Sequence, residues 1–139
     1  MKYFKYDLFL QDNEEEWNKN NLEYSKVFNE IKDNLSESFL EIYFKEYGFH
    51  DKKITNISFV NNVLKIKIAL RYSGFAEIEY SGVDTFSFNA DISNSESLEW
   101  GYDEFGKTVG NKFVHSILIL NGTELEIHFN SIKATYIYD

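Results

Sequence analysis

The chain has 139 residues, of which 43% are hydrophobic and 18% aromatic, and it carries a formal net charge of -9 at pH 7. This length fits one domain, and so high an aromatic content excludes intrinsic disorder. Because the chain has no cysteine, it has no disulfides, thiolate zinc sites or cysteine nucleophiles, and its acidity argues against nucleic-acid binding, which requires clustered Lys and Arg. We expect a single domain over residues 1–139, mainly helical over 1–48 and antiparallel β over 49–139.

No stretch of the sequence resembles an export signal or a membrane span. Lys2, Lys5 and Asp7 interrupt the N-terminal apolar residues, and the longest apolar run, residues 117–120, is far shorter than the roughly 20 residues that span a bilayer. We therefore expect a cytoplasmic protein that has no membrane partner. The abundance of Asn, Lys, Ile, Tyr and Phe suggests a bacterial source.

The apolar spacing in the first third of the chain is helical. Apolar residues recur there in steps of seven, four and three, which keeps one face of a helix apolar. This spacing predicts two amphipathic helices, over residues 13–32 and 35–47. We expect their aromatic stripe to face the core, and a partner-binding groove is the other interpretation. Asp12 or Asn13 is expected to cap the first helix, and Asn34 the second.

After Gly48 the apolar period becomes two, which predicts strands. Asn61-Asn62 separates the expected strands 54–60 and 63–70 as a two-residue hairpin turn, because asparagine tolerates the positive φ values of a type I′ turn. Pairing across this turn sets apolar residues opposite one another on one face.

Further strands are expected over 75–80, 84–88, 98–102 and 132–138, and on both sides of Asn121-Gly122. A three-residue loop, Ser81-Gly82-Val83, is expected to join two of them as a hairpin. Together these elements predict an α+β fold, in which two N-terminal helices pack on an antiparallel sheet of about seven or eight strands.

The Asn121-Gly122 pair is typical of a two-residue hairpin turn, which fixes the residues that face one another. In that register His115 lies opposite His128, and Glu126 is the diagonal neighbour of His115. Two imidazoles and a carboxylate can bind Zn²⁺ or Fe²⁺ or transfer protons. A small metal-dependent or acid–base enzyme is therefore one hypothesis. The other interpretation is a half-exposed polar pair, for which we expect no cofactor.

Negative charge is concentrated in the middle of the chain. No Lys or Arg occurs between Tyr72 and Gly106, and eight acids lie there: Glu77, Glu79, Asp84, Asp91, Glu96, Glu99, Asp103 and Glu104. A localised field of this kind can steer a basic partner toward the protein. It can also be a solvated face that keeps the protein soluble.

Trp100 and Tyr102 alternate within this acidic segment, which places both rings on one face of a strand. Gly101 between them allows another backbone or a ligand to approach closely. Aromatic anchors surrounded by charge are typical of interface hot spots, although a place in the core is the other interpretation. The leading hypothesis is an immunity- or inhibitor-like protein-interaction module that binds a basic partner through Trp100, Tyr102, Glu99, Asp103, Glu104, Glu77 and Glu79.

His50-Asp51 follows the second expected helix directly. The two residues could form an oriented acid–base pair. Adjacent residues of a strand point to opposite faces, however, so we interpret them as a helix-to-strand junction.

Several segments resemble an uncharacterised bacterial family. They are Met1-Lys2-Tyr3-Phe4, Gly48-Phe49-His50-Asp51-Lys52-Lys53-Ile54, the segment around Val83, Trp100-Gly101-Tyr102-Asp103-Glu104 and the closing hairpin. The resemblance implies a helical part followed by a sheet, and no catalytic residues, because none is assigned in that family. In size, charge and α+β order the chain is also similar to small acidic immunity proteins of bacterial toxin systems.

Overall fold

The structure is a computed structural model that describes residues 1–11, 13–71, 73–89, 98–108 and 110–138. In these residues three α-helices precede the strands of an antiparallel sheet, which confirms the predicted α+β fold. The helices are α1 (Tyr6–Leu10), α2 (Glu14–Ile31) and α3 (Glu37–Lys45). The strands are β1 (Lys53–Val60), β2 (Val63–Ala69), β3 (Phe75–Ser81), β4 (Thr85–Asn89), β5 (Leu98–Lys107), β6 (Phe113–Ile119), β7 (Glu124–Phe129) and β8 (Ser131–Ile137).

The two predicted helices correspond to α2 and α3, whereas the short α1 was not predicted. Asn13 caps α2, its side chain accepting a hydrogen bond from the Glu16 amide at 3.2 Å. The expected cap of α3 at Asn34 is wrong, because Asn34 lies in a 3₁₀ turn that continues α2. Ser36 has the extended backbone that an N-cap needs, and its hydroxyl accepts from the Phe39 amide at 3.2 Å.

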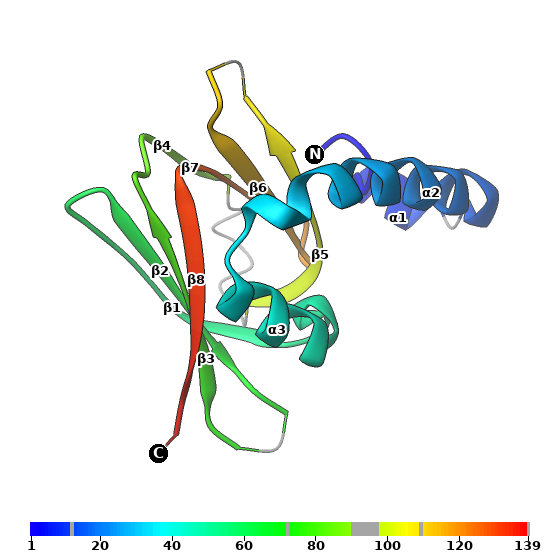
Figure 1. Cartoon of the computed structure of the whole chain (residues 1–139). Coiled ribbons are helices and arrows are strands. Elements are labelled where there is room, and N and C mark those ends of the chain that lie inside the picture. Colours follow the sequence, from blue (N-terminus) through cyan, green and yellow to red (C-terminus); the bar gives the residue numbers. More distant parts are fainter. Residues whose placement is uncertain (12, 72, 90–97, 109, 139) are drawn as a thin grey trace.

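The eight strands follow the order β4-β7-β6-β5-β1-β2-β3-β8, and the sheet is strongly curled (Figure 1). A single residue, Asn130, separates β7 from β8, yet β7 lies next to one end of this order and β8 forms the other. Figure 1 shows β1, β2, β3 and β8 on one side, β5 and β6 on the other, and α3 between them. β1 and β5 form only two residue pairs, so α2 and α3 complete the enclosure of the core there.

The chain does not form the hairpin expected around Ser81-Gly82-Val83. β3 pairs with β2 and β8, whereas β4 pairs with β7 in the other half of the sheet. The chain crosses between the two halves at Gly82 and Val83. Gly82 has a left-handed backbone (φ 67°), and Val83 is buried. The backbone hydrogen bonds of β3 are therefore made with β2 and β8 rather than with β4.

The β1–β2 hairpin forms as predicted. Asn61 and Asn62 have φ values of 53° and 62°, as a type I′ turn requires, and Ile57 lies opposite Ile66. A bulge at Thr55 shifts the register only at the far end of the pair.

The β6–β7 hairpin forms, but the predicted register is wrong by one residue. The loop has three residues, Leu120-Asn121-Gly122, and the Ile119 amide donates to the Thr123 carbonyl at 2.8 Å. Gly122 takes the left-handed position (φ 95°) that ends such a loop. Because side chains alternate along a strand, this shift exchanges the inward and outward residues of β6.

A second one-residue irregularity occurs in β5. The pairing with β6 shifts between Trp100 and Tyr102, so Gly101 forms a β-bulge. Beyond the bulge, Asp103 and Phe105 face the same interior as Trp100, and Tyr102 lies on the other face. The prediction that Trp100 and Tyr102 share a face is therefore wrong.

Candidate functional site

The structure does not bring the predicted metal set together. His115 lies opposite Ile127 and is completely buried, whereas His128 lies opposite Val114 on the other face of the sheet. His128 Nε2 lies 3.2 Å from Glu126 Oε2, and that pair is partly exposed. Among the described residues, no three His, Asp or Glu side chains are placed to hold a metal ion. The hypothesis of one site built from both histidines is therefore corrected.

The acids of β3, and Asp84 just before β4, are paired with lysines rather than left as an open negative surface. Glu79 contacts Lys133 at 2.9 Å and Lys65 at 3.6 Å, and the hydrogen bond from Lys133 lowers the pKa of Glu79. Glu77 also lies 4.0 Å from Lys65, and Asp84 lies 2.8 Å from a lysine. Two other acids of this segment, Asp91 and Glu96, lie outside the described residues, and Glu99 is half-buried.

The two expected aromatic anchors, Trp100 and Tyr102, do not form an exposed pair on one face of β5. Trp100 is completely buried against Phe49, with ring centroids 5.3 Å apart. Tyr102 is half-buried, 4.7 Å from the Trp17 ring and 4.9 Å from the His50 ring. The close approach at Gly101 is made by the chain itself, because a side chain there would meet the Leu118 carbonyl oxygen at 2.8 Å.

Glu104 is also buried, and it holds the N-terminal segment. Its carboxylate accepts hydrogen bonds from the backbone amides of Lys2 and Tyr3, the latter at 2.8 Å. Burial raises the pKa of Glu104, and these amide donors partly offset that shift. Glu104 therefore anchors the chain beside β5, and Phe4 packs into the core there.

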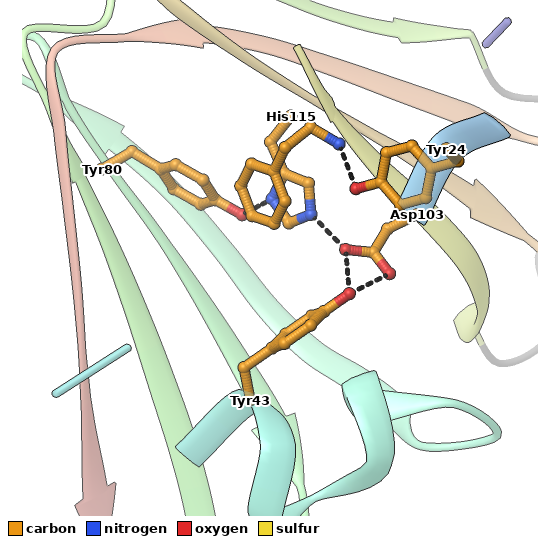
Figure 2. A network of polar contacts seen from close by, with 6 residues as sticks. Tyr24, Tyr43, Tyr80, Asp103 and His115 are labelled. Atoms are coloured by element: carbon orange, nitrogen blue, oxygen red, sulfur yellow. Dashed lines mark hydrogen bonds and ion pairs between the residues drawn. The ribbon is translucent and has the colours of Figure 1, made fainter. Parts of the chain in front are cut away.

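A buried polar network lies at the centre of the fold (Figure 2). Tyr80 Oη lies 2.7 Å from His115 Nδ1, and His115 Nε2 lies 2.6 Å from Asp103 Oδ2. Tyr43 Oη donates to both carboxylate oxygens of Asp103, at 2.9 and 3.0 Å. The network therefore connects α3, β3, β5 and β6.

The hydrogen-bond partners fix the proton positions in this network. The Asp103 carboxylate only accepts hydrogen bonds, so His115 Nε2 donates to it, and in the neutral imidazole Nδ1 then accepts from Tyr80 Oη. Burial and the Asp103 charge raise the pKa values of Tyr43 and Tyr80, which keeps both hydroxyls protonated as donors. The His115 ring also stacks on Phe105, with centroids 3.8 Å apart.

This arrangement resembles an acid–base relay, but neither His115 nor Tyr80 is exposed to solvent. A substrate cannot reach the imidazole without unfolding of the core, so we assign the network a positioning role. Its outer member is Tyr43, which is half-buried and links the network to the molecular surface.

A groove of about 370 Å³ lies between α2 and α3, directly outside the network. We call it the aromatic groove, because its walls are Tyr24, Phe28, Tyr43 and Phe44, with polar α2 residues at its rim. Tyr24 and Tyr43 are fixed from behind: the Phe105 amide donates to Tyr24 Oη at 2.7 Å, and Tyr43 is bound to Asp103. Phe44 remains 57% exposed.

From the sequence, the aromatic stripe of the helices is interpreted as core-facing rather than as a partner-binding groove, and Asp103 is assigned to the acidic surface. The sequence signal for the inward position of Asp103 was Gly101, since a glycine inside a strand pattern often marks a bulge. A bulge there reverses the facing of Asp103 and Phe105.

His50 and Asp51 are closer together than a strand would allow. Asp51 has a left-handed backbone (φ 65°), and its Oδ1 lies 3.5 Å from His50 Nε2. The pair lies between the turn Tyr47–Phe49 and β1, so it is a helix-to-strand junction as interpreted from the sequence. The alternation argument does not apply, because neither residue belongs to a strand.

No family model matches this chain, and no curated protein matches it. The bacterial-family resemblance therefore stays a prediction. One solved structure is similar, that of an uncharacterized protein from Neisseria gonorrhoeae, with 21% sequence identity and a TM-score of 0.46 over 62% of this chain and 91% of that chain. This likeness carries no argument about function. Among the described residues, no helix is long and apolar enough to cross a membrane.

Proposed function

We propose that the chain is a protein-interaction module of the bacterial cytosol, immunity- or inhibitor-like, and that a basic partner binds at the aromatic groove. The observation that carries this proposal is the exposed Phe44 ring beside walls that the buried network holds in place. Fixed aromatic side chains lose little conformational entropy on binding, which is why they dominate interface hot spots.

The charge of the helical part supports a basic partner. In residues 1–48 eleven acids outnumber six lysines, and the acids at the start of α2, Glu14, Glu15 and Glu16, are exposed. These charges can steer a basic surface toward the groove in a salt-dependent manner. The acids of β3 are less suited to this role, because lysines pair with them.

The test compares Phe44→Ala with Leu22→Ala. Leu22 is a similarly exposed apolar residue of α2, 69% exposed, and it does not line the groove. Each immobilised protein is incubated with a lysate of the source organism at low and high salt. Any retained protein is then purified, and its affinity for each variant is measured by calorimetry.

We expect a partner that Leu22→Ala retains and Phe44→Ala loses, with affinity reduced by about tenfold or more, because hot-spot truncations cost about 2 kcal/mol or more. High salt should weaken binding of the wild-type chain. Equal retention on both variants, or no saturable partner on the wild-type chain, would overturn the proposal.

A further inference from the structure

A second groove, of about 550 Å³, lies between the turn after α3 and the end of β2. We call it the basic groove; its lining includes Tyr47, His50, Lys52, Lys53, Leu70 and Arg71. Three cationic side chains thus gather in a chain whose net charge is -9, and Arg71 is the only arginine of the sequence. The local charge therefore opposes that of the whole molecule.

The cationic side chains of the basic groove differ in the hydrogen bonds and ion pairs that they make within the protein. Lys52 donates to the Glu46 carbonyl at 3.0 Å and lies 3.8 Å from its carboxylate. Lys53 is exposed, and no ion pair to it occurs within the described part of the chain. The acid of the groove, Asp51, lies beside His50 Nε2, while His50 Nδ1 donates to a backbone carbonyl of β5.

The backbone beside the basic groove is strained and rigidly held. Tyr47, Phe49 and Asp51 have backbone φ values of 53°, 62° and 65°, which residues other than glycine rarely adopt. Two hydrogen bonds of 2.8 Å, from the Asp51 amide to the Trp100 carbonyl and from the Trp100 amide to the Lys52 carbonyl, fix this turn to β5. Strain that the surrounding structure maintains is typical of ligand-binding sites.

We propose that the basic groove binds the phosphate group of a small organic molecule. Lys53 and Arg71 contact the phosphate, because the guanidinium fork and the ammonium are both matched to phosphate oxygens. The Tyr47 ring, which is 85% exposed at the rim, packs against the organic part of the ligand. This site is separate from the aromatic groove and does not depend on the proposed protein partner.

The test is an NMR titration of the full chain with phenyl phosphate, which carries both a phosphate and an apolar ring. The variants Lys53→Met and Arg71→Gln each remove one cation from the groove. Lys19→Met is the matched control, because Lys19 is an exposed lysine of α2 outside the groove. We expect saturable shifts at the groove, unchanged affinity in the control, and about tenfold weaker binding in each groove variant.

Inorganic phosphate and chloride, at matched ionic strength, separate specific binding from screening. We expect phenyl phosphate to bind more tightly than inorganic phosphate, and Tyr47→Asn to abolish that difference, since asparagine tolerates the left-handed backbone. Shifts that chloride reproduces, or equal affinity in Lys53→Met and Lys19→Met, would overturn the proposal. Equal binding of the two phosphates would overturn the role of Tyr47.

Discussion

Two charged regions of the molecule contain carboxylates beside basic side chains, but they differ in burial. In the interior, Asp103 is 8% exposed and is held by His115 and Tyr43. On the outside of the sheet, Glu79 pairs with the more exposed Lys65 and Lys133. Removing a partner from a buried pair leaves an unsolvated polar group, whereas water replaces the partner outside. The interior network therefore determines stability, and the exterior pairs mainly neutralise charge.

Asp103→Ala should cause the largest loss of stability. It leaves His115 Nε2 and Tyr43 Oη without their acceptor inside the core, so we expect a loss of about 3–5 kcal/mol in the free energy of unfolding. Urea denaturation measures this loss, and Glu79→Ala is the exterior control, with an expected change of about 1 kcal/mol or less. Similar losses in the two variants would remove the distinction between the regions.

Gly101→Ala should have the next largest effect, because it disturbs the bulge that turns Asp103 inward. The added Cβ would lie 2.8 Å from the Leu118 carbonyl oxygen, so we expect a loss of about 1–3 kcal/mol. Gly106→Ala in the same strand is the control, since nothing lies within 4 Å of its added Cβ. Thermal unfolding of both variants checks this, and equal melting temperatures would argue against a tightly packed bulge.

Tyr80→Phe removes one hydroxyl from the network and leaves its shape unchanged. His115 Nδ1 loses its buried partner, so we expect a loss of about 1–2 kcal/mol in urea denaturation. The matched control is Tyr136→Phe, whose hydroxyl binds Glu46 at 3.1 Å nearer the surface. A control that loses as much stability as Tyr80→Phe would contradict the importance of burial.

Lys133→Met should have the smallest effect, about 0.5 kcal/mol at neutral pH. Because Lys133 lowers the pKa of Glu79 from its ordinary 4.5, the pair contributes stability above that pH and loses it as the pH falls through the lower folded-state value. In the variant, an NMR titration should show the Glu79 pKa moving back up. An unchanged pKa would mean that Lys65 alone holds the carboxylate.

The sequence was sufficient to predict the α+β order, both long helices and the β1–β2 hairpin, because each rests on a regular period. The contents of the core were less predictable. Two glycines, Gly101 and Gly122, each introduce a one-residue irregularity that exchanges the faces of the residues beyond it. Asp103 and His115 meet inside only because both irregularities occur. A strict alternation places each of them outside.

The aromatic groove was harder to predict for another reason. Phe28 and Phe44 belong to apolar patterns that a core-facing helix also produces. In the structure the Phe28 ring of α2 lies 6.2 Å from Phe105 of β5, whereas Phe44 of α3 remains 57% exposed. Lys53 and Arg71 likewise come together through the β1–β2 pairing and the turn before β1.

The position of β8 has a consequence for synthesis on the ribosome. The last strand pairs with β3, where Ile137 lies opposite Phe75, and Ala134 of β8 donates to Ser38 of α3. A nascent chain that has not yet released its final segment exposes the apolar sides of β3 and α3 to water. The domain therefore becomes compact only after β8 has left the ribosome, and until then these surfaces are open to chaperones.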